Sequence, residues 1–339
     1  VTGVQTCALP ILETHIAIKK GARPCYKPGV FSDVKCDQNM ISLIPTHKST
    51  RIFQNPKKVE SYANKIKGKE SRLGDPENPR DAYDYDLEIY HYLKKIEMKR
   101  QPIPNYFDYQ TTIRPRMRAI VIDWLIGVHF HMEMHTDTLY TAVTIGDLFL
   151  SKVDLHRSKL QLLFCTALFM AAKMEEIELP SLKDFIYFTK NSFTEEDMTK
   201  MESSVFTVIE FSNNVIHSST FLKRFLRLYP NPTLEISMLA HYINESMLLE
   251  EKLIGVPPSK RAAAVICLTL GIERGPKAWN SFLADNTGYT VTDLQPLVNT
   301  ILTSLKQIKS KFSASVKKYD HDYFESVSRI ELPESMIFE

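Results

Sequence analysis

The 339-residue sequence predicts an all-α protein that contains two similar sets of five helices. Apolar residues recur at intervals of three and four over most of the chain after residue 82, which is the spacing of one helix face. The alternation of apolar and polar residues that marks a strand is scarce. After residues 213–219, NNVIHSS, the helical pattern starts again with segments of matching length, so we predict a duplicated helical unit.

Charge divides the chain into a basic leader and a slightly acidic body. Residues 1–80 hold 14 Lys and Arg against 7 Asp and Glu, giving +7, while the remainder holds 28 against 33, giving −5. Such a basic and weakly apolar leader is expected to be disordered. Its opening, VTGVQTCALPI, lacks a basic n-region and an initiator Met, which argues against a signal peptide and suggests that the natural amino terminus is missing.

Cysteine spacing and apolar runs narrow the class of protein further. The five cysteines, at 7, 25, 36, 165 and 267, show no CxxC spacing, so neither a disulfide framework nor a zinc module is indicated. We therefore expect a reducing, intracellular setting. The longest apolar run, residues 262–272, is shorter than a membrane span.

The expected helices follow in order along the chain. A first helix is expected over 83–99, after the turn-forming residues 74–82. Thr194 and Asp197 have capping-box spacing at the start of the last helix of the first set. The first set contains 117–128, 136–151, 158–176, 181–190 and 195–211. The second set covers 221–229, 236–250, 259–273, 276–284 and 293–308, and a polar tail follows.

Residues 117–128, MRAIVIDWLIGV, carry a charge where none is expected. On a helix, Arg118 falls inside the apolar arc, and only Asp123 and Gly127 open a polar gap. An unpaired charge in apolar surroundings is costly. This helix is therefore expected either to lie at the centre of a helical domain or to present one face to a partner.

Five motifs of the first set resemble the first box of the mitotic cyclins. They are MRAIVIDWL, GDLFLS, KLQLL, AAKMEEI and KMESSVFTVIEF, in that order. KLQLL and TLYTAVTIGDLFLS are most similar to B-type cyclins within the A/B family, in particular to the third B subtype. The resemblance extends from about residue 81 to 325 and is weaker in the second half.

The resemblance implies two tandem five-helix cyclin folds, or cyclin boxes, with an additional N-terminal helix. The domains would be a leader (1–80), a docking helix and linker (81–110), an N-terminal cyclin box (111–213), a C-terminal cyclin fold (214–310) and a tail (311–339). The resemblance also implies that Arg118 forms a buried ion pair with Asp147. That role is structural and not catalytic.

No enzyme motif is present in the sequence. Phosphate-binding GxGxxG and GxxxxGK loops are absent, and so are the HRD and DFG motifs of kinases. The resemblance implies a regulatory subunit that binds and activates a cyclin-dependent kinase to control mitotic (G2/M) progression. The kinase would hold ATP and magnesium, so no cofactor is expected in this chain, and no direct nucleic-acid or membrane contact.

The resemblance assigns eight residues to kinase binding. Lys173 and Glu202 match the family's pair that hydrogen-bonds to the kinase around its αC helix. The others match apolar contacts beside that pair or lie on the preceding helix: Met170, Met174, Phe211, Tyr85, Ile89 and Tyr92. From spacing alone, a solvated Lys173 with Met170 and Phe211 in the core stays an open alternative.

A second surface is implied for substrate and inhibitor proteins. The matching residues form a shallow hydrophobic patch that docks RxL-type peptides: Met117, Ile120, Val121, Trp124 and Gln161. Gly127 stands where the A-type member has an acidic residue, so weak or altered RxL docking is expected. The alternative is that Trp124 and Met117 are simply core residues.

Two further departures from the family lie near the kinase side. Asn213 replaces an apolar residue after Phe211, and Leu179 replaces the first of two prolines expected near Pro180. Both leave the fold intact and leave open which kinase is the partner.

The segment HFHMEMH, residues 129–135, has two histidines at metal-compatible spacing. His131 and His135 are i and i+4 on a helix, but the HExxH order and a third ligand are absent. A solvated helix end and loop is the better interpretation, and no metal site is predicted.

Signals for destruction and targeting are weak. A B-type cyclin is expected to meet ubiquitin ligase machinery, yet the leader contains neither an RxxL box nor a KEN sequence. RSKL (157–160) and RIEL (329–332) fit RxxL, but such short matches arise by chance. The resemblance implies a location in nucleus and cytoplasm, and the lysine-rich segment 57–69 either aids nuclear import or is a solvated tail.

Two other functions compete with kinase activation. A cyclin-fold transcription factor predicts a basic body that binds DNA, which the −5 charge of the body opposes. A helical scaffold without a kinase partner predicts that Lys173 and Glu202 are dispensable for every interaction.

Overall fold

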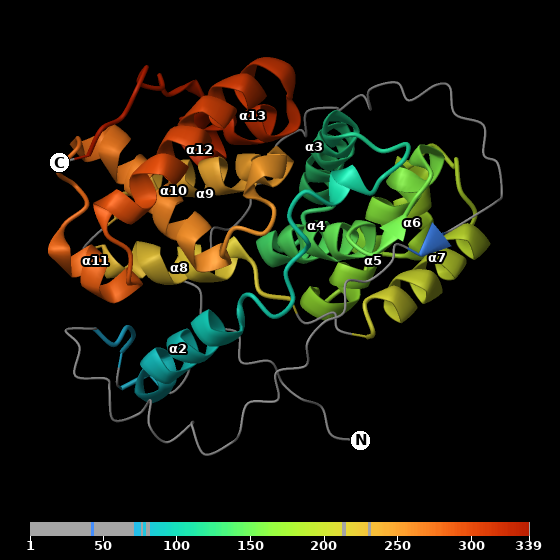
Figure 1. Ribbon diagram of the computed structural model, residues 1–339, viewed down its shortest axis with the longest axis horizontal. Helices are drawn as coiled ribbons and strands as arrows, with labels where there is room; N and C mark the ends of the chain where they lie inside the picture. Colours follow the sequence, from blue (N-terminus) through green and yellow to red (C-terminus); the bar gives the residue numbers. More distant parts are fainter. Residues whose placement is uncertain are drawn as a thin grey trace.

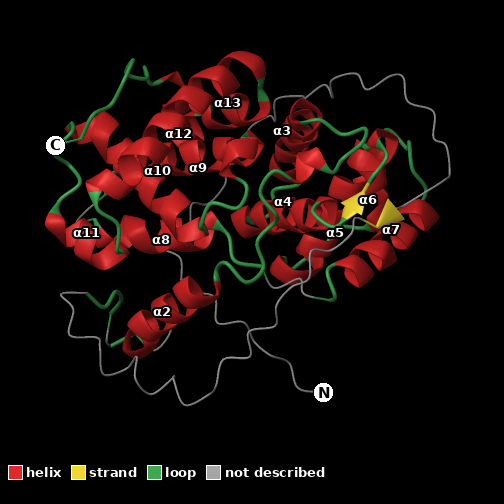
Figure 2. Ribbon diagram, in the orientation of Figure 1, coloured by secondary structure: helices red, strands yellow, loops and turns green. Residues whose placement is uncertain are grey.

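The computed structural model describes residues 42–43, 71–75, 77–78, 82–211, 215–229 and 232–338. In these residues nearly all regular structure is helical (Figure 1, Figure 2). Two short strands, β1 (Ser42–Leu43) and β2 (Val153–Asp154), pair antiparallel. Most of the rest of the leader, including its lysine-rich segment, lies outside the described residues, as does Asn213. No helix in the described part is long and apolar enough to cross a membrane.

The first set of helices surrounds one buried helix. It consists of α3 (Pro115–His131), α4 (Thr136–Leu150), α5 (Leu160–Glu175), α6 (Leu182–Phe188) and α7 (Glu195–Val208). α5 is buried without interruption from Leu162 to Ala172 and packs against the other four helices, as its apolar sequence requires. The predicted capping box of α7 is confirmed, because the side chains of Thr194 and Asp197 each accept the other's backbone N–H.

The second set repeats this arrangement, with α10 at its centre. It consists of α8 (Ser218–Leu228), α9 (Leu234–Ser246), α10 (Pro258–Arg274), α11 (Ser281–Thr287) and α12 (Val291–Lys311). α10 packs against α8, α9 and α12. The prediction of two five-helix sets is confirmed.

Two predicted helix boundaries in the second set are wrong. The helix expected over 276–284 begins only at Ser281, because the Asn280 side chain caps it by accepting the N–H of Leu283. The helix expected to reach residue 250 ends at Ser246 and continues as the 3-10 turns Met247–Leu249 and Glu251–Leu253.

α2 (Asp86–Ile96) lies against the second set, below α8 in Figure 1, and is held at both ends. At its start, buried Asp86 pairs with Arg224 of α8 at 2.7 Å. Just past its end, the Glu97 carboxylate accepts the N–H and the hydroxyl of Ser259 at 2.8 and 2.7 Å. Burial raises the pKa of Glu97, and the hydrogen bonds from Ser259 oppose that rise.

The segment assigned to the tail contains α13 (Ala314–Tyr319), which packs against α3 of the first set and α9 of the second. The Ala314 N–H donates to Asp123 of α3 at 2.9 Å. Lys318 forms a buried ion pair with Glu245 of α9 at 2.6 Å. α13 therefore ties the two sets together.

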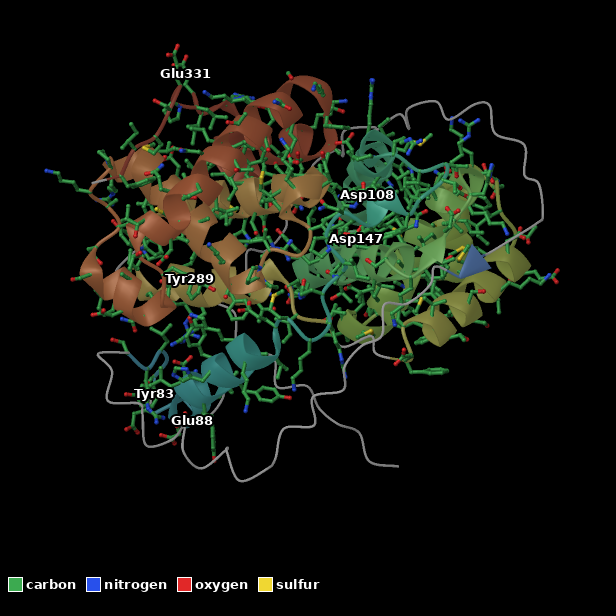
Figure 3. The ribbon with its side chains drawn as sticks, in the orientation of Figure 1. Tyr83, Glu88, Asp108, Asp147, Tyr289 and Glu331 are labelled. Carbon is green, nitrogen blue, oxygen red and sulfur yellow. The ribbon has the colours of Figure 1, made fainter. Side chains whose placement is uncertain are left out.

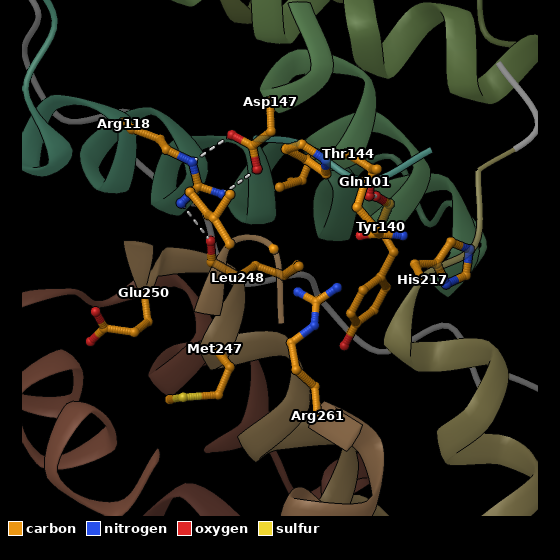
Figure 4. A pocket seen from close by; sticks show the side chains of 14 residues that line it. Gln101, Arg118, Tyr140, Thr144, Asp147, His217, Met247, Leu248, Glu250 and Arg261 are labelled. Atoms are coloured by element: carbon orange, nitrogen blue, oxygen red, sulfur yellow. Dashed lines mark hydrogen bonds and ion pairs between the residues drawn. The ribbon is translucent and has the colours of Figure 1, made fainter. Parts of the chain in front are cut away.

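Arg118 of α3 lies where the two sets meet. Its Nε and Nη2 donate to the two oxygens of Asp147 at 2.7 and 2.6 Å, and its Nη1 donates to the Leu248 carbonyl at 2.9 Å (Figure 4). The Tyr106 hydroxyl donates to the same carboxylate at 2.8 Å. Burial alone would lower the pKa of Arg118, but Asp147 and Tyr106 raise it above its usual value, so the guanidinium stays charged.

A polar cavity of about 20 Å³ adjoins this ion pair (Figure 4). It has room for about one water molecule and none for a substrate. Arg261 and His217 line it, and burial lowers their pKa values to about 10 and about 4. The His217 ring stacks on Tyr140 with centroids 5.5 Å apart. The cavity is thus part of the packed contact between the sets.

Replacing Asp147 with alanine should strand the buried charge of Arg118. We expect a loss of roughly 3–5 kcal/mol in the free energy of unfolding, measured by urea denaturation. The matched control is Asp320→Ala, whose ion pair with Arg329 is exposed and should matter little. Equal effects of the two substitutions would contradict the structural role of Arg118.

Acid should destabilise the chain through its buried histidines. Burial lowers the pKa of His217 to about 4 and that of His129 to about 3, against 6.5 for an exposed histidine. Below pH 6.5 these histidines bind protons in the unfolded chain but stay neutral in the folded chain. The free energy of unfolding therefore falls as pH drops, by up to roughly 3 kcal/mol per histidine by pH 4.

His217→Gln should therefore reduce the slope of unfolding free energy against pH between 6.5 and 4, measured by urea titrations at several pH values. The control substitution is His321→Gln, which replaces an exposed histidine. A slope identical in the parent and His217→Gln would show that His217 titrates normally.

Candidate functional site

An ion pair stands at the exposed end of α5 and the adjacent face of α7. Lys173 Nζ lies 2.6 Å from Glu202 Oε1, and the same ammonium lies 4.2 Å from the centroid of the Phe169 ring. The Lys173 side chain is more exposed than that of Glu202. The pair is therefore formed in the chain alone, with its polar atoms at the surface.

Exposed apolar side chains flank this pair. Large apolar side chains are usually buried, either in the core or under a partner. Phe211 is 73% exposed and stacks on Phe206, while Met174 is exposed in the last turn of α5. Ile177, just beyond α5, is fully exposed, at 102%. Sequence reasoning missed Ile177, although its place after the helix end, in EEIELP, was the available signal.

Met170 does not belong to this exposed surface, so its assignment as a kinase contact has no support from the fold and stays a prediction. Its side chain is 1% exposed. It lies one turn closer to the middle of α5 than Met174, where the other helices of the set enclose α5 on all sides. The exposed side chains of α5, Lys173 and Met174, lie in its last turn.

α2 supplies a second surface. Tyr85 and Tyr92 are exposed, Ile89 is half-buried, and with Ala82 and Glu88 they line a shallow apolar hollow. Glu88 is labelled on this helix in Figure 3. The anchors at the two ends of α2 fix the direction in which this face points.

The predicted peptide patch, on α3 and the start of α5, is only partly accessible. Val121 and Trp124 are largely buried, whereas Met117, Ile120 and Gln161 are half-buried. Val121 and Trp124 thus form the floor of a strip whose accessible parts are Met117 and Ile120. The interpretation of Met117 as a plain core residue is not supported, whereas Trp124 is mainly core.

The two histidines after the patch have separate roles. His131, at the end of α3, packs edge-on against Phe188 of α6 at 5.2 Å between centroids. His135 caps α4 by accepting the Asp137 N–H at 3.3 Å. Across the residues with described positions, no three His, Cys, Asp or Glu side chains are grouped as metal ligands.

Comparison with known proteins finds a matching family model for each half of the chain. Residues 88–214 match the family model of the cyclin N-terminal domain, and residues 216–333 match that of the cyclin C-terminal domain. A viral cyclin from herpesvirus saimiri has a similar fold, with a TM-score of 0.56 at 16% identity over 68% of this chain and 100% of the viral one.

Curated relatives extend the match. Cyclin-A3-2 of Arabidopsis thaliana is 33% identical over 262 residues, which cover 74% of this chain and 70% of the relative. G2/mitotic-specific cyclin-4 of Candida albicans is 32% identical over 83% of this chain and 59% of its own length. The protein of the same name from Saccharomyces cerevisiae is 33% identical over 70% of this chain and 51% of its own length.

The chain thus spans between about half and 70% of the length of these relatives. Three findings indicate the same family: the matches to both cyclin domains, the repeated five-helix fold, and the relatives of the A and G2/mitotic types. The chain belongs to the cyclin family.

Proposed function

We propose that this chain is the activating subunit of a cyclin-dependent protein kinase and has no catalytic activity of its own. The observation that carries the proposal is the Lys173–Glu202 pair, exposed beside Met174 and Phe211 on a chain of the cyclin family. Relatives named as G2/mitotic-specific support a role at the entry into mitosis.

The pair suits a docking surface for the kinase αC helix. The Lys173 ammonium carries three N–H donors, and Glu202 accepts one of them through a single oxygen, so both retain hydrogen-bonding capacity. The apolar side chains around them would exclude water when the kinase covers them. A helix pressed inward by this surface would seat the kinase Lys–Glu pair that positions ATP.

The α2 surface would extend the kinase footprint. Because α2 is anchored on the second fold and Lys173 lies on the first, a kinase that touches both would bridge the two folds. Such a bridge needs the folds to be held in one orientation before the kinase arrives, which reduces the conformational cost of binding.

Substrate and inhibitor proteins would dock on the strip formed by Met117 and Ile120, with Gln161 beside it. Short apolar anchors supply affinity and a polar neighbour orients the peptide backbone. Gly127, half-buried one turn after Trp124, offers no charge to a basic peptide residue. We therefore expect weak binding of RxL-type peptides.

Kinase activation should depend on Lys173 and Glu202. In a histone phosphorylation assay with a purified mitotic cyclin-dependent kinase, Lys173→Ala and Glu202→Ala should each lower activation at least tenfold, because each leaves the other charge unpaired under the kinase.

The matched controls for that assay are Lys200→Ala and Glu196→Ala, which remove an exposed ion pair from the same helix α7. They should leave activation unchanged. Full activation by the Lys173 and Glu202 variants would reject the docking surface, and the absence of a complex with any such kinase would favour the scaffold alternative.

Peptide docking should improve when the missing charge is supplied. Gly127→Glu should strengthen binding of a fluorescent RxL peptide several-fold in anisotropy titrations, and salt should screen the gain. Gly127→Gln adds nearly the same volume without charge and is the control. Equal affinities for the two variants would place the peptide's basic residue elsewhere.

A further inference from the structure

Residues 330–338 run as an extended segment along α12. Glu331, labelled in Figure 3, lies at the outer edge of the molecule near the start of this segment. Lys309 Nζ donates to the Ile330 carbonyl at 3.2 Å, Lys306 Nζ to the Glu334 carbonyl at 3.0 Å, and Gln295 Nε2 to the Met336 carbonyl at 2.7 Å. The segment thus runs antiparallel to α12, whose side chains bind its backbone.

Gln295 binds the last part of the segment twice. Its Nε2 donates to Met336 and its Oε1 accepts the Phe338 N–H at 2.9 Å, so one side-chain amide brackets Ile337. A neighbouring strand would satisfy the same two backbone groups in β-strand addition. This contact is independent of the side chains of the segment.

Alternate side chains of the segment point to opposite sides. Met336 and Phe338 are 8% and 7% exposed, whereas Ile337 between them is 75% exposed. The site therefore selects apolar residues at the first and third positions and places no requirement on the side chain between them.

Gly271 of α10 makes room for both anchors. A Cβ at this position would lie 2.7 Å from the Phe338 ring and 3.3 Å from the Met336 Cε. No larger residue fits there without moving the segment, since carbon atoms in contact lie about 3.5–4.0 Å apart. The site formed by Gly271, Gln295 and Lys306 is called the tail site below.

The tail site occupies a place in the second fold that corresponds to the Lys173–Glu202 surface in the first. α10 and α12 are the third and fifth helices of their set, as α5 and α7 are of theirs. Gly271 lies near the end of α10, as Lys173 does in α5. The same helix pair is open in one fold and covered by the chain's own segment in the other.

We propose that the tail site is a binding site for extended peptides with an apolar–any–apolar pattern. The resident occupant is the chain's own Met336–Ile337–Phe338, and a partner segment with the same pattern binds by displacing it. Two buried side chains and a few side-chain hydrogen bonds hold the occupant, which suits an exchangeable ligand more than a fixed part of the core.

The test uses the full chain with the occupant released by Met336→Ser and Phe338→Ser. The probe is a fluorescent synthetic peptide of residues 331–339, ELPESMIFE, and the control peptide is ELPESSISE. Anisotropy should show that the released chain binds ELPESMIFE at least tenfold more tightly than it binds the control peptide. The parent chain should bind the probe at least tenfold more weakly, because its site is occupied.

Gln295→Ala in the released chain should weaken probe binding about tenfold through the loss of two backbone hydrogen bonds. Gln307→Ala changes an exposed glutamine of the same helix and should have no effect. A released chain that keeps its helical circular dichroism and cooperative unfolding but does not bind the probe overturns the proposal.

If the released chain does not fold, hydrogen exchange of the parent chain decides. Exchange of the Phe338 amide, which donates to Gln295, should be at least tenfold faster than exchange of the amides in the middle of α10. Protection of Phe338 equal to that of α10 would make the segment a fixed part of the core and would reject the proposal.

Discussion

The guanidinium of Arg118 brings a full positive charge into the contact between two helical folds, where an unpaired charge costs several kcal/mol. Asp147 neutralises it from α4, and the Leu248 carbonyl binds it from the second fold. Tyr106 fixes the carboxylate from the linker before α3. Apolar packing is non-directional, whereas the hydrogen bond from Arg118 to the Leu248 carbonyl crosses between the folds and has a defined direction, so it helps to set how one fold sits on the other.

α3 connects this buried ion pair to the surface of the protein. Arg118 points into the junction, Met117 and Ile120 form the accessible strip, and Asp123 binds the start of α13. The Lys318–Glu245 pair then fastens α13 to the second fold. Because α2 is anchored on that fold, the two parts of the proposed kinase footprint hold their positions only while the folds hold theirs.

The sequence predicted what local pattern controls. Helix positions followed from apolar spacing and the capping box from Thr194 and Asp197. One charge in an apolar arc marked α3 as a helix that lies either at a domain centre or against a partner, and Arg118 is found paired at the junction of the two folds. The sequence pattern could not predict tertiary contacts. Met170 and Met174 have the same chemistry on the same helix, and only the enclosure of α5 by its neighbours decides that the first is buried. The docking of Met336 and Phe338 against Gly271 likewise depends on a contact that no local spacing encodes.

The two halves of the duplicated fold differ in how the surface of their third and fifth helices is covered. Each half contains a third and a fifth helix side by side, and large apolar patches left open on such a pair promote association. In the second half the chain covers this pair with Met336 and Phe338. In the first half Ile177 and Phe211 stay exposed around a charged pair. An exposed apolar surface that the chain could cover, and does cover in its other half, is best explained by a partner that covers it instead. This asymmetry supports the Lys173–Glu202 surface as a place where a partner docks, on grounds independent of the family's motifs.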